Sequence, residues 1–198
     1  MTGLGMAEPI VSLAEAQAFA RIETDDEEAL LAGLIRTASG LCEAFLGQVV
    51  IARQFQVSIQ ATSDWQRLSV TPVRSIDLVE TVASDGLRMT MAVDGYAIDV
   101  DSKGDGWIRL TRVPLPELAA VAALMGEDRI MPEYFRQGYV SVSGTAGIAL
   151  TENDVPEPIR QGVLRLVTSL FADRDGDGGD IPAAVTALWR PYRRMRVL

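Results

Sequence analysis

The chain has 198 residues, of which 48% are hydrophobic, so it is long and apolar enough to bury a globular core. It contains no histidine and one cysteine, Cys42, which excludes Ser-His-Asp and Cys-His catalysis, a His/Cys zinc cluster and an internal disulfide. The formal net charge is −9, which disfavours affinity for DNA over the chain as a whole.

The N-terminal residues 1–9 lack the basic and apolar regions of a signal peptide, and no apolar run reaches the roughly 18 residues of a membrane span. We therefore expect a cytosolic protein that does not bind a membrane. No catalytic constellation is recognisable, so we expect no enzyme activity, no catalytic residues and no cofactor.

Two helices are predicted at the start of the chain. Ser12 is a suitable N-cap for the first, and Glu15 completes a capping box. Thr24 and Glu27 form the same pattern before the second helix, and Gly47 is a natural stop. Cys42 lies on the apolar side of this second helix, where we expect it to be a buried small hydrophobe.

Apolar residues then alternate with polar ones from residue 49 to residue 110, which predicts a series of strands. Asp85-Gly86 and Asp94-Gly95 are hairpin signals, so we expect an antiparallel sheet. Residues 113–138 are less readable, with a short helix expected over 116–125, and residues 139–143 resemble one more strand.

Helices return at the end of the chain. An amphipathic stripe over residues 159–170 predicts one helix, and residues 182–189 predict a shorter one that Pro191 ends. We therefore predict an α+β fold, in which the N- and C-terminal helices pack as a small helical bundle with an inserted antiparallel β domain. The predicted bounds are 1–48 and 151–198 for the helical core and 49–150 for the β domain.

An acidic loop over residues 173–180 matches the first half of an EF-hand loop. Acids stand at the first, third and fifth positions and Gly178 at the sixth, but Ala184 replaces the bidentate glutamate that closes such a site. We interpret the loop as a flexible acidic connection rather than a calcium site, so no metal is expected.

The C-terminal tail differs from the rest in charge. Residues 189–198 contain four arginines and no acid, a charge of +4, whereas residues 1–188 carry −13. Arginine binds carboxylates bidentately and stacks on aromatic rings, and interfaces are enriched in tryptophan, tyrosine, arginine and methionine. The alternatives are that the tail is a disordered, solubilising end or that it binds nucleic acid. We favour the interpretation that the tail binds in a groove of a partner protein. The candidate partner-binding residues are Trp189, Arg190, Tyr192, Arg193, Arg194, Met195 and Arg196.

Three segments carry a resemblance to a known family. They are Ser12 to Ile22 with the acids Asp25, Asp26 and Glu27, the stretch from Val155 to Leu164, and the closing stretch from Leu188 to Arg196. In this order and spacing they resemble the head–tail connector, or adaptor, proteins of tailed phages, a family with members in gene transfer agents.

The resemblance implies a ring of identical subunits, expected to be a dodecamer, beneath the portal protein. Such a ring joins the DNA-filled head to the tail through a stopper or tail-terminator protein, and DNA passes through its channel without sequence-specific binding. The protein would be cytoplasmic during assembly and then part of the particle neck. In the family the C-terminal segment reaches the portal. The resemblance therefore implies that the residues in contact with the portal are Arg190, Tyr192, Arg193, Arg194 and Arg196. The alternative is a regulatory protein-binding module that recruits another partner through the same tail.

Overall fold

The computed structural model describes residues 2–5, 7–22, 27–82, 86–111, 139–173 and 180–194. They form two compact units. The described residues of 6–53 and 147–198 make a helical unit, and those of 1–5 and 54–146 make a β unit. The predicted α+β fold, with helices from both ends of the chain and strands from its middle, is confirmed.

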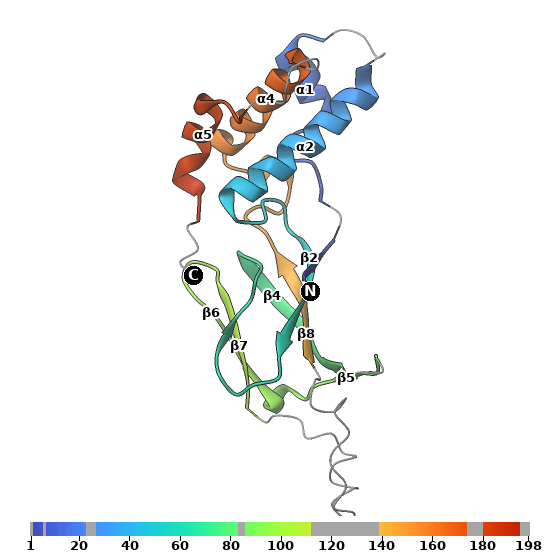
Figure 1. Ribbon diagram of the computed structural model, residues 1–198, viewed down its shortest axis with the longest axis vertical. Coiled ribbons are helices and arrows are strands. Elements are labelled where there is room, and N and C mark those ends of the chain that lie inside the picture. Colours follow the sequence, from blue (N-terminus) through green and yellow to red (C-terminus); the bar gives the residue numbers. More distant parts are fainter. Residues whose placement is uncertain are drawn as a thin grey trace, which may run out of the picture. The chain divides into compact units, whose positions relative to one another are not determined.

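The helical unit is built on α2 and α4, which lie side by side in Figure 1. The helices are α1 (Leu13–Ala20), α2 (Glu28–Leu46), α4 (Glu157–Ala172) and α5 (Ala183–Trp189). One face of α2 is buried because its apolar residues recur at helical spacing. The hydrophobic side chains buried from α2 and α4 are Leu31, Ile35, Ala38, Cys42, Leu46, Ile159, Val163, Leu164, Leu166 and Val167.

The predicted helix ends are only partly reproduced. Ser12 caps α1 by accepting a hydrogen bond from the Glu15 backbone N–H at 3.2 Å, but the Glu15 carboxylate does not close the capping box. It accepts instead from Arg160 of α4 at 2.7 Å, and this hydrogen bond raises the pKa of Arg160. Gly47 ends α2 with a φ of 66°, as predicted. The predicted N-cap Thr24 lies outside the described residues.

Cys42 is fully buried in the helical unit, as predicted. Burial removes the thiolate from water and so raises the pKa of the Cys42 thiol. We expect iodoacetamide to leave the native chain unlabelled at pH 8 and to label it fully in urea, as measured by mass spectrometry. Since the unfolded thiol ionises near pH 8.5 and the buried one does not, raising the pH past about 8.5 should also lower the free energy of unfolding. Native labelling at the rate of the unfolded chain would contradict the burial.

The helical unit extends beyond residue 48, where its first segment was predicted to end. The Glu43 carboxylate accepts the Val50 backbone N–H at 2.8 Å and both terminal guanidinium nitrogens of Arg53 at 2.7 Å. Ile51 then pairs with Ala149 through a parallel bridge, and both residues are buried in the helical core. The boundaries between the units therefore lie at residues 53–54 and 146–147.

The described residues of the β unit form two sheets. One has the strand order β1-β2-β8-β4-β5, and the other has the order β3-β7-β6. The five strands of the first are Thr2–Leu4, Arg53–Gln60, Tyr139–Ala146, Val73–Val82 and Arg88–Thr90, and the three of the second are Gln66–Arg67, Gly106–Leu110 and Tyr96–Val100. Alternate residues of β2 are buried, as expected for a strand with one covered face.

The β unit differs from the prediction in two places. Residues 2–4 form β1, paired antiparallel with β2, so this end of the chain belongs to the β unit and not to the helical core. Asp94-Gly95 does not close a hairpin, because it lies in a 3₁₀ turn between β5 of one sheet and β6 of the other. The predicted hairpin β4–β5 is present. β6 and β7 also pair antiparallel, although no hairpin was predicted between them. The short helix predicted over 116–125 lies outside the described residues.

Candidate functional site

The root of the arginine-rich tail is folded onto the helical unit. α5 follows Pro182, whose fixed backbone suits the start of a helix, and it runs directly into a 3₁₀ turn over Arg190–Tyr192. Pro191 lies inside this turn, where it has no helical hydrogen bond to donate. The described chain then continues in extended form to residue 194.

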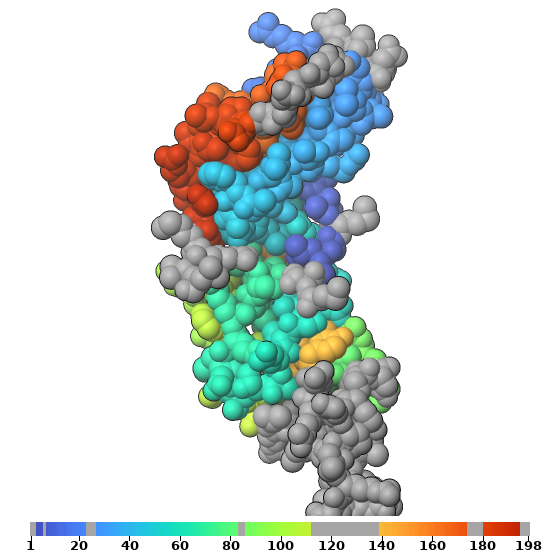
Figure 2. Space-filling model, in the orientation of Figure 1, coloured from blue at the N-terminus to red at the C-terminus, as the bar shows by residue number. Residues whose placement is uncertain are grey.

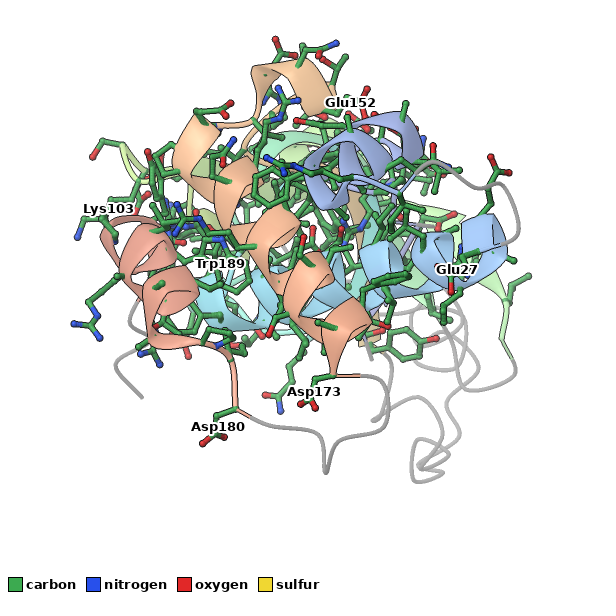
Figure 3. The ribbon with its side chains drawn as sticks, turned by 90° about the horizontal axis from the view of Figure 1, so that it is seen from above. Glu27, Lys103, Glu152, Asp173, Asp180 and Trp189 are labelled. Atoms are coloured by element: carbon green, nitrogen blue, oxygen red, sulfur yellow. The ribbon has the colours of Figure 1, made fainter. Side chains whose placement is uncertain are left out.

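Trp189 belongs to the core and not to the surface. Its side chain has 0% exposure, and its indole Nε1–H donates to the Ile159 carbonyl of α4 at 3.1 Å (Figure 3). Gly162 leaves room for the indole, since a Cβ there would collide with the ring. Phe45 of α2 packs beside it, with ring centroids 5.8 Å apart. The expectation that Trp189 contacts a partner is therefore corrected: within its own chain it anchors α5 on α2 and α4.

The C-terminal end of α2 holds the residues that follow. Gln48 donates from its side-chain amide to the Tyr192 carbonyl at 2.6 Å. The Arg194 backbone N–H donates to the Leu46 carbonyl at 2.9 Å, satisfying one of the carbonyls that a helix end leaves without a partner. Gly47 makes this approach possible by turning the chain at the helix end. The tail thus leaves the helical unit from a fixed position.

The guanidinium of Arg193 lies over the Phe45 ring, 5.1 Å from its centroid. Two arginines, Arg190 and Arg193, are exposed, while Tyr192 and Arg194 are half-buried. In the described part of the chain, neither exposed arginine forms an ion pair with a carboxylate. Both positive charges are therefore available to an acidic or aromatic surface of a partner.

The remaining predicted site residues, Met195 and Arg196, lie outside the described residues. The same holds for most of the acidic loop, of which only Asp173 and Asp180 are described (Figure 3). Among the residues that the structure describes, no group of three or more histidine, cysteine, aspartate or glutamate side chains is arranged to hold a metal ion.

The tail contacts four residues at the C-terminal end of α2 that the sequence did not predict as part of the site. They are Phe45, Leu46, Gly47 and Gln48. The sequence does indicate that Gly47 ends a helix. It carries no signal that this helix end meets a segment 144 residues later, because a hydrogen bond such as that of Gln48 to Tyr192 follows no local period.

The chain is similar over its full length to chains of three solved structures of gene transfer agent (GTA) particles. A chain of the neck of an empty GTA particle, computed with C6 symmetry, gives a TM-score of 0.74 at 24% sequence identity. A chain of the virion of a native GTA particle gives 0.71 at 23%, and one of the neck of a native GTA particle, computed with C12 symmetry, gives 0.69 at 23%. Each match covers 100% of this chain and 97% of the other.

At these identities the similarity establishes a shared fold. No protein-family model and no curated protein matches the chain.

Proposed function

We propose that this chain is a structural component of the neck of a gene transfer agent or related phage-like particle, where it acts as a head–tail connector. The observation that carries the proposal is the fold shared with GTA neck chains along 100% of this chain, at a TM-score of up to 0.74. The match includes both the helical unit and the β unit. In this proposal the chain has a mechanical role and uses no cofactor.

In this proposal, copies of the chain form a ring beneath the portal and join the DNA-filled head to a stopper or tail-terminator protein. The net charge of −9 suits a ring whose channel DNA must pass without sticking, because like charges repel. The protein would assemble in the cytoplasm and remain in the finished neck.

The portal contact is assigned to the tail beyond the buried Trp189. Arg190 and Arg193 supply exposed charge, and Tyr192 and Arg194 connect the tail to the end of α2. Met195 and Arg196 would extend the same contact, as the sequence resemblance implies. A tail whose root is already ordered loses less conformational entropy when it binds than a free tail would.

Removal of the gene from the producing organism tests the function. Without the connector, heads and tails should accumulate as separate structures in electron micrographs, and the yield of joined particles should fall to background. Expression of the chain from a second locus should restore joining. Joined, DNA-transferring particles at the normal yield in the deletion strain would contradict the proposal.

A further inference from the structure

The outward face of α2 is apolar although no part of the described chain covers it. The residues of this seam are Leu30, Gly33, Thr37, Gly40 and Ala44, and Leu41 lies beside them. Their spacing alternates between three and four residues, so they share one side of the helix. The inward side is a separate row that begins at Leu31 and ends at Leu46. The helix therefore has two apolar faces, of which the fold uses one.

The exposure of this face is unusual for a surface helix. Leu30 is 41% exposed and Leu41 is 37% exposed, and Figure 2 shows the blue-to-cyan surface of α2 lying open to solvent. An 18-residue window of α2 has a mean hydropathy of 1.4, yet only 33% of that window is buried. Between Ala29 and Ala44 the only exposed charged residue is Arg36. The seam residues themselves are uncharged, with Arg36 beside Gly33, and such an apolar stripe indicates a contact surface.

The two glycines of the seam indicate how close that contact is. A glycine inside a helix costs about 1 kcal/mol relative to alanine. Packing within the described part of the chain does not require glycine here: a Cβ at Gly40 would have no described neighbour within 4 Å, and one at Gly33 would meet only the Arg36 guanidinium at 3.9 Å. Small residues on one helix face allow another backbone to approach closely.

The charges of the chain indicate which kind of partner binds this face of α2. A membrane surface is disfavoured because Glu27 and Glu28 stand at the start of α2, where anionic headgroups would repel them. A second copy of this chain also carries a net charge of −9, so repulsion between two copies is smallest where their facing surfaces carry little charge. The seam of α2 meets that condition. The GTA necks with chains of the same fold have C6 or C12 symmetry, which places identical subunits side by side.

We propose that the α2 seam is the surface on which the neighbouring copy packs in the ring. This inference rests on the proposed neck function. Two seams packed on each other would give a closed two-fold dimer, so in a ring the seam must meet a different surface of the next copy. The 19-residue helix is about 28 Å long, and a strip about 10 Å wide along it covers roughly 300 Å². Standard interfaces bury about 800 Å² per partner, so the seam is one part of a larger contact.

Glutamine substitutions at the two glycines separate assembly from folding. Because both positions are open in the single chain, Gly33→Gln and Gly40→Gln should leave the melting temperature of the purified protein unchanged or raise it. In particles, the same side chains should obstruct the neighbouring copy. We expect the amount of the chain in purified particles, measured by immunoblot, to fall at least tenfold, since about 1.4 kcal/mol at each contact has that effect. Ala172→Gln, at an exposed position of α4, is the matched control and should assemble normally.

A thiol footprint gives a second readout. Cys42 is buried, so Thr37→Cys places the only accessible thiol of the described chain in the seam. It should react with maleimide in the free protein and be protected in particles. Normal incorporation of both glutamine variants, or equal labelling of Thr37→Cys in the two states, would overturn the seam assignment and leave the neck function standing. Absence of the unmodified chain from particles would overturn the neck function itself. Flotation of the purified chain with phosphatidylglycerol vesicles, lost in Gly40→Gln, would assign the seam to a membrane instead.

Discussion

Replacing Trp189 with alanine is expected to lower the free energy of unfolding of the helical unit by about 3–5 kcal/mol. The indole is fully buried, packs beside Phe45 and donates a hydrogen bond to the Ile159 carbonyl. Its loss leaves a cavity between helices and removes the largest fully buried side chain at the end of α5. Urea unfolding followed by circular dichroism measures the change.

Two further variants distinguish packing from hydrogen bonding at this position. Trp189→Phe keeps an aromatic ring but leaves the Ile159 carbonyl without its partner, so we expect a smaller loss of about 1–3 kcal/mol. Gly162→Ala keeps the tryptophan and places a methyl group where the indole lies, which should also destabilise the unit by about 1–3 kcal/mol. Wild-type stability in Trp189→Ala would show that the tryptophan is not part of the core.

Neutralising the exposed tail arginines is expected to abolish joining while leaving the fold intact. The double variant Arg190→Gln with Arg193→Gln removes two charges that have no carboxylate partner within the described chain. A hydrogen bond to a charged group contributes about 1.5–3 kcal/mol, so the loss of even one at the portal should lower affinity at least tenfold. The measurement is the number of heads joined to tails and of separate heads, counted in electron micrographs of particles from a strain that carries the variant.

The matched control removes the same charge elsewhere. Lys103→Gln with Arg165→Gln changes two exposed basic residues outside the tail and should leave the yield of joined particles unchanged. The unfolding curve of the control should overlay that of the unmodified protein. The tail variant loses the contact of Arg193 with the Phe45 ring, so its free energy of unfolding should fall by no more than about 1 kcal/mol. Full joining with the tail variant would reject the tail as the portal contact, even if the chain is in the neck.

Local patterns in the sequence predicted the parts of the fold that depend on neighbouring residues. Ser12 before an apolar stripe and Gly47 after one mark helix ends, because capping involves residues only a few positions apart. The alternation in β2 and the burial of Cys42 follow from the same kind of periodicity. Residues 2–4 could not be placed in this way, since strand β1 depends on a partner more than 50 residues away.

The sequence predicted the tail as a candidate partner-binding segment, but it did not predict which tail residues are buried within the chain. Tryptophan and arginine together suggested a surface contact, whereas the structure separates them: Trp189 is buried and Arg190 is exposed. The burial of Trp189 depends on Gly162, which leaves space on α4 for the indole. The sequence of the tail itself contains no pattern that indicates this space. The proposed portal contact therefore begins after Trp189, and a truncation meant to test it has to retain that residue.

The most direct test of the account is a reconstruction of the neck by electron cryo-microscopy of particles from the producing organism. The account predicts a ring between portal and tail into which copies of this α+β chain fit, with the α2 seam at the contact between copies and the residues after Trp189 directed into the portal. A neck of normal composition in which every density is filled by other proteins, and this chain is absent, would contradict it.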